Sequence, residues 1–310
     1  MFSVIFPGQG SQSVGMTKEL HDNFAYVRDL FKQADDVLGY PISKIILEGP
    51  KEDLDLTENT QPAIFLASYS IFKMIKKESD INLVDAKYFA GHSLGEYSAL
   101  ATSGSLDFRN AIKLLNQRGK AMQTAVPKNT GGMLAVLGVE IEEINNLLKE
   151  NQSNFKCYIA NDNSNGQIVI SGLNPEIDKF IEILKLKKIK NIKLQVSAPF
   201  HCKLMEKATS IMTDKINNIN FEKPKNIIIS NVTGSETQEI SEIKNLLIKQ
   251  IESPVRWRES VIYMIKNGVT NFIEIGPGKV LSGLIKRIDK TVNVNTINKL
   301  EDLKNIKLHD

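Results

Sequence analysis

The sequence predicts an α/β protein in which a small ferredoxin-like unit is inserted into a larger α/β domain. Short apolar runs end in glycine-containing turns and are followed by helical patterns, as is typical of α/β domains. Residues 133–197 follow the order strand, helix, strand, strand, helix, strand, which defines the ferredoxin-like unit. After this segment, strands and helices alternate again to the end of the chain.

The first part of the large domain begins with a strand at 3–6 and the polar, glycine-containing turn Pro7–Gln12. Apolar residues in 61–77 recur on one broad helical face, and a later helix is closed by Pro127 and a pair of glycines. The expected elements of this part are strands at 3–6 and 87–90 and helices at 23–38, 61–77, 96–102 and 108–125.

The pattern changes at Met133, where the inserted unit is expected to begin. Its elements are strands at 133–139, 156–160, 167–171 and 191–197 and helices at 140–150 and 174–187. The large domain then continues with strands at 226–230 and 270–275 and helices at 240–251, 256–267 and 279–288. We therefore divide the chain into a large α/β catalytic domain, residues 1–130 and 198–310, and a ferredoxin-like small subdomain, residues 131–197.

The composition excludes several classes of protein. With 42% apolar and 24% charged residues, the 310-residue chain has the composition of a globular protein. Its 39 basic and 36 acidic residues leave a net charge of +3, too close to balance to favour a nucleic-acid-binding protein. Two cysteines, Cys157 and Cys202, can build neither a disulfide framework nor a zinc site made of paired Cys-x-x-Cys units.

The chain shows no segment that targets it to a membrane. The N-terminus has no basic region and too short an apolar run for a signal peptide, and Ala63–Ile75, the longest apolar segment, is interrupted by polar residues. We expect a soluble, cytoplasmic protein that does not bind a membrane.

The segment Gly91-His92-Ser93-Leu94-Gly95 joins a predicted strand to a predicted helix, which is the setting of a nucleophile elbow. The glycines permit a sharp turn, and the serine hydroxyl then lies at a helix N-terminus, where an oxyanion is favoured. The alternative is a serine that only caps the helix.

A serine nucleophile needs a base, and the chain contains four histidines. His309 is next to the C-terminal residue, His21 is expected in a loop before a helix, and the side chain of His92 should diverge from its neighbour Ser93. His201 remains, in the turn after the last strand of the inserted unit. The alternative is a structural histidine in a loop.

Arginine is rare in this lysine-rich chain, with six residues among 39 basic ones. Arg118 lies in a mostly apolar helix before the domain boundary, where its planar guanidinium could bind a carboxylate. An acyltransferase that handles a dicarboxylic half-thioester would need such a group, whereas an esterase with an apolar pocket would not. A surface salt bridge is the alternative that helical periodicity alone favours.

A set of motifs in this order and spacing resembles the malonyl-CoA:acyl carrier protein transacylase family, over residues 2–297. The motifs are Phe6-Pro7-Gly8-Gln9-Gly10-Ser11-Gln12, Thr60-Gln61-Pro62-Ala63, Gly91-His92-Ser93-Leu94-Gly95-Glu96-Tyr97, Gln117-Arg118-Gly119, Asn161, Val196-Ser197-Ala198-Pro199-Phe200-His201, Ser253-Pro254-Val255-Arg256-Trp257 and Glu274-Ile275-Gly276-Pro277-Gly278.

The resemblance implies a hydrolase-like large α/β domain with a mostly parallel sheet and an active site in the cleft beside the small subdomain. The site residues it implies are Ser93 as nucleophile, His201 as base, the main-chain N–H groups of Gln9 and Leu94 as oxyanion hole, Arg118 for the malonyl carboxylate, the main-chain carbonyl of Gln250 to orient the histidine, and Gln61 and Asn161 in the cleft. From the residues alone, Gln9 and Asn161 are equally well turn residues, and Gln61 and Gln250 are equally well solvated helix positions.

The function implied by the resemblance is transfer of a malonyl group from malonyl-CoA to the phosphopantetheine thiol of acyl carrier protein, for fatty acid biosynthesis, by double displacement and without a metal or redox cofactor. We expect a monomer. Phe200 is compatible with malonyl-selective members but does not decide between malonyl, methylmalonyl and acetyl groups. Two other readings of the sequence remain: a serine esterase or thioesterase, which should place a carboxylate beside His201, and a non-catalytic carrier-protein docking module.

Five lysines between positions 185 and 193 could contact an acidic carrier protein or the phosphates of CoA. In a chain so rich in lysine, a solvated face is the interpretation that the sequence favours.

Overall fold

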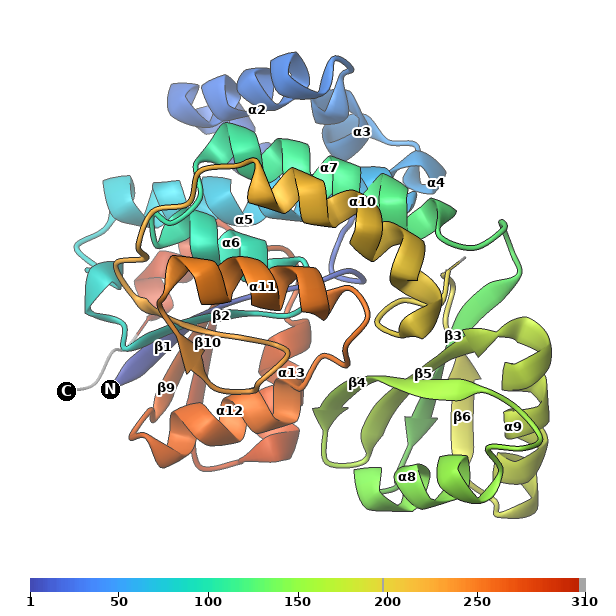
Figure 1. Ribbon diagram of the computed structural model, residues 1–310. Helices are drawn as coiled ribbons and strands as arrows, with labels where there is room; N and C mark the ends of the chain where they lie inside the picture. The colour runs from blue at the N-terminus through green and yellow to red at the C-terminus, as the bar shows by residue number, and fades with distance from the viewer. Residues whose placement is uncertain (197, 307–310) are drawn as a thin grey trace.

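The computed structural model describes residues 1–196 and 198–306 and contains two β-sheets surrounded by helices (Figure 1). The first half of the chain forms β1 (Phe2–Phe6), α1 (Lys18–Asn23), α2 (Ala25–Leu38), α3 (Ile42–Glu48), α4 (Lys51–Leu54), α5 (Thr57–Glu78), β2 (Tyr88–Gly91), α6 (Gly95–Thr102), α7 (Phe108–Thr124), β3 (Gly131–Leu137), α8 (Ile141–Glu150) and β4 (Cys157–Ser164).

The second half forms β5 (Gln167–Leu173), α9 (Asn174–Leu186), β6 (Lys190–Lys193), α10 (Glu206–Asn217), β7 (Ile227–Ile229), β8 (Glu236–Thr237), α11 (Ile240–Gln250), α12 (Trp257–Lys266), β9 (Asn271–Ile275), α13 (Val280–Ile288) and β10 (Asn293–Ile297). Three short 3-10 turns lie at Leu83–Asp85, Lys203–Met205 and Leu300–Asn305. No helix in the described part of the chain is long and apolar enough to cross a membrane.

The larger sheet has the strand order β10-β9-β1-β2-β7-β8, and only β8 is antiparallel to its neighbour. Alternate residues of β1 face opposite sides. Val4 and Phe6 pack with α5, α6 and α7, whereas Ile5 packs with α12 and α13. Both faces are therefore covered by helices, which explains why the inner strands β1, β2 and β7 are mostly apolar. We call this part, with its helices, the large unit.

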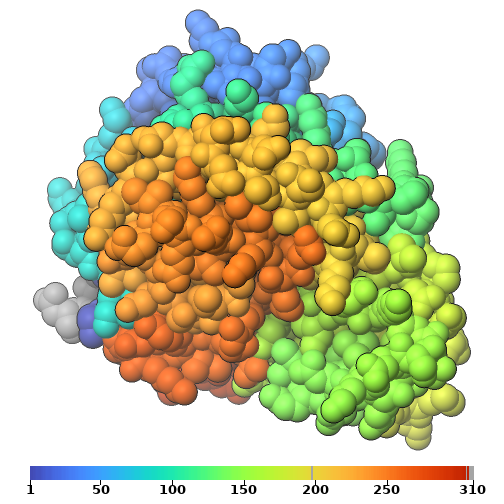
Figure 2. Space-filling model, in the orientation of Figure 1, coloured from blue at the N-terminus to red at the C-terminus, as the bar shows by residue number. Residues whose placement is uncertain are grey.

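Residues 131–193 form the small unit, an antiparallel sheet of order β4-β5-β3-β6 with α8 and α9 packed against one apolar core. This order and the sequence β-α-β-β-α-β are those of a ferredoxin-like unit. The predicted fold class is confirmed. Figure 2 shows the small unit, in green and yellow, beside the orange and red surface of the C-terminal part of the large unit.

Hydrogen bonds join β4 to the large unit beside the site. The N–H of Val255 donates to the carbonyl of Ala160 (2.8 Å), and the N–H of Asp162 donates to the carbonyl of Val255 (2.9 Å). The Asp162 carboxylate also accepts two hydrogen bonds of 3.0 Å from Nε of Arg258. The two units are thus linked through main-chain as well as side-chain contacts.

Helix α5 begins at Thr57, four residues before the predicted start. The helix therefore contains Pro62, which cannot donate a hydrogen bond to the carbonyl four residues earlier. In the structure Nδ2 of Asn116, from α7, donates to that carbonyl of Glu58 (3.0 Å), so the helix continues through the proline.

Other elements differ from the prediction. The strand predicted at 191–197 is shorter, ending at Lys193, and Ser197 lies outside the described residues. The prediction missed α1, α3, α4, α10, β8 and β10. Helices α3 and α4 are too short to show helical periodicity, and the edge strand β10 contains few of the apolar residues that mark a buried strand.

Candidate active site

Ser93 lies in a tight turn between β2 and α6, as the sequence predicts. Its φ angle is 53°, in the left-handed region that a non-glycine residue adopts at a cost. A Cβ atom at Gly91 would lie 1.9 Å from the main chain of Gly95, and a Cβ at Gly95 would lie 2.3 Å from the carbonyl of Phe6. Both glycines are therefore required for the turn that presents the serine.

Ser93 and His201 form a hydrogen-bonded pair although they are far apart in the sequence. The Oγ of Ser93 lies 2.8 Å from Nε2 of His201, and Nδ1 of His201 lies 2.8 Å from the main-chain carbonyl of Gln250. Because a carbonyl can only accept, Nδ1 carries the proton, and Nε2 is left free to accept one from the serine. No carboxylate of the described residues forms a hydrogen bond or ion pair with the His201 ring.

Neither His21 nor His92 forms a hydrogen bond with Ser93 Oγ. His92 points away, with Nε2 2.8 Å from Oδ1 of Asn163. His21 lies within α1, not in the predicted loop, and its ring is 3.4 Å from Asp22. His309 lies outside the described residues.

Arg118 projects from α7 into the site and is 1% exposed, so the alternative of a surface salt bridge is wrong. Its NH1 donates to Oε1 of Gln61 (2.9 Å), and its NH2 donates to Oε1 of Gln250 (2.9 Å) and to Oγ of Ser93 (3.2 Å). Its Nε has no hydrogen-bond partner, and no carboxylate in the described residues forms an ion pair with it. A buried guanidinium without an acidic partner is rare because burying an unpaired charge is costly.

Burial and nearby charges perturb the titration of this cluster. Burial, and then the positive charge of Arg118, lower the pKa of His201 to about 3, so the imidazole is neutral at physiological pH. Burial also lowers the pKa of Arg118 itself. Such shifts are concentrated at functional sites.

These residues surround a small cavity of about 100 Å³. Its walls are formed by Gln9, Gln61, His92, Ser93, Leu94, Arg118, Met122, Met133, Asn161, Leu194, Val196, Phe200 and His201. Every site residue implied by the sequence thus lines the cavity, except Gln250, which contacts His201 and Arg118 from behind. Gln61 and Gln250 are both buried, so the alternative of solvated helix positions is wrong for each.

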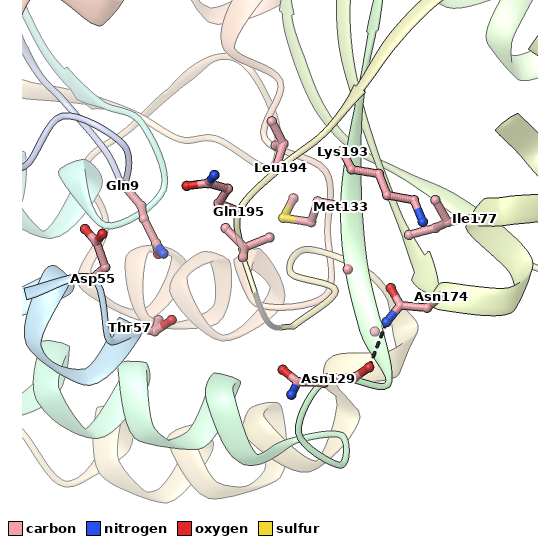
Figure 3. Close-up of a pocket in the computed structure, with 13 residues that line it drawn as sticks. Gln9, Asp55, Thr57, Asn129, Met133, Asn174, Ile177, Lys193, Leu194 and Gln195 are labelled. Atoms are coloured by element: carbon pink, nitrogen blue, oxygen red, sulfur yellow. Dashed lines mark hydrogen bonds between the residues drawn. The ribbon is translucent and has the colours of Figure 1, made fainter. Parts of the chain in front are cut away.

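A wider groove of about 340 Å³ adjoins the cavity and shares four wall residues with it, namely Gln9, Met133, Leu194 and Val196. Figure 3 shows Gln9 and Asp55 of the large unit on one side of this groove and Lys193 of the small unit on the other. The cavity therefore lies at the junction of the two units.

Two main-chain donors and one side-chain acceptor in the cavity wall are unpaired. The N–H groups of Gln9 and Leu94 have no acceptor among the described residues, and Leu94 caps the N-terminus of α6, where the helix dipole favours negative charge. The Oδ1 of Asn161 is shielded from solvent and has no donor.

Sequence reasoning missed two residues of the site, Asn231 and Glu96. The Oδ1 of Asn231 accepts a hydrogen bond from the N–H of Ser93 (2.7 Å), and the Oε2 of Glu96 accepts one from Nε2 of Gln250 (2.8 Å). Asn231 follows a predicted strand of the large sheet, and polar residues at such carboxyl ends often belong to sites. This position at the end of a strand is the sequence feature that could have identified Asn231. For Glu96 the corresponding feature is a carboxylate in the first turn of the helix that follows the elbow.

The fold and the site define an acyl-group transferase, and comparison with known proteins agrees. Residues 3–303 match the family model of the acyl transferase domain. The malonyl CoA-acyl carrier protein transacylase of Haemophilus influenzae is 41% identical over 96% of this chain and 95% of its own length. The chain belongs to the malonyl CoA-acyl carrier protein transacylase family.

Solved structures show the same similarity. The acyl-carrier-protein S-malonyltransferase of Bartonella henselae is 38% identical, with a TM-score of 0.95 over 98% of this chain and 97% of that one. A malonyl-transacylase solved in complex with the acyl-carrier protein of a type II polyketide synthase is also 38% identical, with a TM-score of 0.93 over 98% of this chain and 97% of that one.

Proposed function

We propose that this protein transfers the malonyl group of malonyl-CoA to the phosphopantetheine thiol of acyl carrier protein through a malonyl ester of Ser93, and so supplies extender units for fatty acid biosynthesis. The observation that carries this proposal is the position of Arg118. Its buried guanidinium forms no ion pair with an acidic residue in the described part of the chain and lies 3.2 Å from the Ser93 hydroxyl. A substrate carboxylate on the acyl group would supply the missing partner.

In the first half-reaction, Ser93 Oγ attacks the thioester carbonyl while Nε2 of His201 takes the hydroxyl proton. The N–H groups of Gln9 and Leu94 stabilise the negative oxygen of the tetrahedral intermediate. The C–S bond then breaks, the protonated His201 returns its proton to the sulfur, and CoA leaves as a thiol. The malonyl group remains as an ester on Ser93.

In the second half-reaction, the phosphopantetheine thiol of the carrier protein gives its proton to His201 and attacks the ester. The bond between the malonyl carbonyl carbon and Oγ of Ser93 breaks, and Oγ recovers the proton from His201. Each step moves only protons and an acyl group between protein and substrate groups, so the proposal includes no metal and no redox cofactor.

The charge on Arg118 connects substrate binding to the strength of the base. In the empty site this charge helps to keep the pKa of His201 low. A malonyl carboxylate paired with Arg118 offsets the charge, so the pKa of His201 rises and the imidazole becomes a stronger base when the substrate is bound. An acetyl group does not have this effect.

Asn161 and the small unit lie beside the cleft in which the reaction takes place. We assign the Oδ1 of Asn161 to an amide N–H of the phosphopantetheine arm, because the oxygen lacks a donor. Residues 131–197 act as the subdomain that forms one side of the cleft beside Ser93. The protein acts as a monomer, since all the reacting groups come from one chain, and in the cytoplasm, where thiols stay reduced.

The proposal is tested by intact-mass spectrometry after mixing the protein with malonyl-CoA in the absence of a thiol acceptor. We expect one malonyl adduct on the wild type and none on Ser93→Ala, because water competes poorly in a buried cavity. Hydrolysis of malonyl-CoA without an adduct would instead indicate an esterase, and an adduct that persists in Ser93→Ala would disprove the assignment of the nucleophile.

A further inference from the structure

Glu96 is a buried carboxylate that the reaction steps above do not use. It lies in the first turn of α6, three residues after Ser93, and is 2% exposed. Its Oε2 accepts hydrogen bonds from Nε2 of Gln250 (2.8 Å) and from the N–H of Asn231 (3.0 Å). No lysine, arginine or histidine among the described residues forms an ion pair with it, and burial raises its pKa to about 7.

The Gln250 side chain connects this carboxylate to the arginine of the site. An amide has one donor end and one acceptor end. The donor end, Nε2, faces Glu96, and the acceptor end, Oε1, accepts a hydrogen bond from NH2 of Arg118 (2.9 Å). If the amide were reversed, two N–H groups would face each other at Arg118, and two oxygens would face each other at Glu96. Nε2 also donates to the main-chain carbonyl of Ser93 (3.1 Å) and to Oδ1 of Asn231 (3.3 Å), so the carboxylate is the charged member of a group of oxygens that holds this end of Gln250 away from the arginine.

We propose that Glu96 is a positioning residue that holds the Arg118 guanidinium ready for the substrate carboxylate by helping to fix and to polarise the Gln250 amide. This inference rests on the proposed function. When Glu96 is ionised, at a pH above its pKa of about 7, it and Arg118 act as an ion pair relayed through the amide: the negative charge strengthens the bond from Nε2, and the polarised oxygen then binds the guanidinium more tightly. The Arg118 fork stays available for an incoming carboxylate because its partners, on Gln61, Gln250 and Ser93, are neutral oxygens instead of a directly bound acid.

The same carboxylate also supports the elbow, through Asn231. The Oδ1 of Asn231 accepts from the N–H of Ser93 (2.7 Å), and its Nδ2 donates to the carbonyl of Gly91 (2.7 Å). A purely structural role through this branch would affect every acyl donor equally. A role through Gln250 and Arg118 would affect only a donor that carries a carboxylate.

The chain offers a matched control in Glu274, which is also fully buried and also accepts hydrogen bonds. Its partners are the N–H groups of Leu281 (3.0 Å) and Ser282 (2.8 Å) and the Ser282 hydroxyl. These groups belong to the N-terminus of α13, and none of them contacts Arg118 or Gln250. Replacing Glu274 by Gln measures the effect of removing a buried carboxylate elsewhere in the large unit.

The experiment compares malonyl-CoA and acetyl-CoA as donors for Ser93 acylation in the wild type, Glu96→Gln and Glu274→Gln. Gln is nearly isosteric with Glu but removes the negative charge that strengthens the hydrogen bond from Nε2 of Gln250. All assays are run about one pH unit above the Glu96 pKa of about 7, where the wild-type carboxylate is ionised. We expect Glu96→Gln to lower kcat/KM for malonyl-CoA by roughly fivefold to tenfold, mainly through a higher KM, and to leave acetyl-CoA within about twofold. Glu274→Gln should leave the ratio of the two donors unchanged.

Two further variants test the relay from its other end. Gln250→Leu removes the amide but keeps the main-chain carbonyl that orients His201, and should lower the malonyl to acetyl ratio by about tenfold or more. When Arg118 is already Ala, adding Glu96→Gln should not change the ratio further, because Glu96 acts through the arginine.

The outcomes separate this inference from the proposed function. An equal loss for both donors, or an unchanged donor ratio, in Glu96→Gln overturns the relay while the wild type still forms its malonyl adduct. If Glu96→Gln does not fold, an unchanged ratio in Gln250→Leu overturns the relay, and a lowered ratio supports it. A wild type that forms no adduct overturns the proposed function itself, and with it the relay.

Discussion

The large unit supplies the reacting side chains of the site, whereas the small unit supplies parts of its walls. Ser93, Arg118 and Gln250 come from three segments of the large unit, and their contacts with one another are 2.9 to 3.2 Å long. The small unit contributes Met133 and Asn161, which form no hydrogen bond to these groups.

This difference indicates that the two units have separate tasks. The side chains of the large unit that form the site are buried and hydrogen-bonded to one another, so a substitution of one of them should disturb the reaction. Wall residues of the small unit are not part of that network, so a change there should affect how the substrate fits. The following predictions test the separation.

The largest effect is expected at His201, which we propose takes and returns the proton in both half-reactions. His201→Ala should slow acylation by malonyl-CoA and transfer to the carrier thiol by ~10²-fold or more, the usual contribution of a positioned general base. Single-turnover measurements of each half-reaction test this. Near-normal rates in either one would mean that another group acts as the base.

Arg118→Ala should affect one substrate only. We expect kcat/KM for malonyl-CoA to fall by roughly two orders of magnitude, while acetyl-CoA transfer stays equal or improves because an unpaired buried charge is removed. Lys at this position should restore only part of the activity, since a point charge cannot reproduce the planar fork. A proportional loss for both donors would show that Arg118 supports the fold instead.

A smaller effect is expected at Asn161 in the small unit. Asn161→Ala should raise KM for malonyl-CoA by about fivefold, the worth of one neutral hydrogen bond, and leave kcat nearly unchanged. Steady-state kinetics on the wild type and the variant test this. A fall in kcat comparable to that of His201→Ala would contradict the separate tasks of the two units.

The smallest change is expected in the pH dependence. Because the pKa of His201 is lowered to about 3, the base stays neutral, and kcat/KM for acetyl-CoA should change by less than about twofold between pH 7 and 5.5. A histidine with an ordinary pKa of about 6.5 would lose roughly eightfold over this range. Acetyl-CoA is the suitable donor because it has no carboxylate that Arg118 would bind.

The same pKa shift has a consequence for stability. A histidine whose pKa is lowered by folding contributes stability that is complete above its unfolded pKa and is lost as the pH falls toward the folded value. The contribution of His201 should therefore disappear between about pH 6.5 and 3, and His201→Gln should flatten this part of a pH series of urea unfolding measurements.

The sequence predicted the family, and it predicted that the residues to which we assign the reaction lie together, because these residues belong to short local motifs or are rare in the chain. Ser93 was predicted from the short motif of the elbow. His201 was predicted by eliminating the other three of the four histidines, and Arg118 because arginine is rare in this lysine-rich chain. The main-chain carbonyl of Gln250 was expected only from the resemblance. No local pattern predicts which main-chain group faces a histidine 49 residues away.

The roles of Glu96 and Asn231 could not be predicted in the same way. Each acts through hydrogen bonds between segments more than 100 residues apart, such as Glu96 to Gln250 and Asn231 to Ser93. Periodicity describes a residue's own helix or strand and does not report which distant side chain it meets. The short helices α3 and α4 were missed because one or two turns show no clear period.

The hydrogen bonds between Val255 and strand β4 have a consequence for the speed of substrate exchange. Rotation of the small unit away from the large one would break both main-chain bonds and the ion pair of Asp162 with Arg258. Hinge motions of domains take microseconds to milliseconds, whereas exposed side chains change rotamer in picoseconds to nanoseconds. We therefore expect acyl groups to enter past moving side chains such as the partly exposed Leu194, so that product release does not wait for a domain to open.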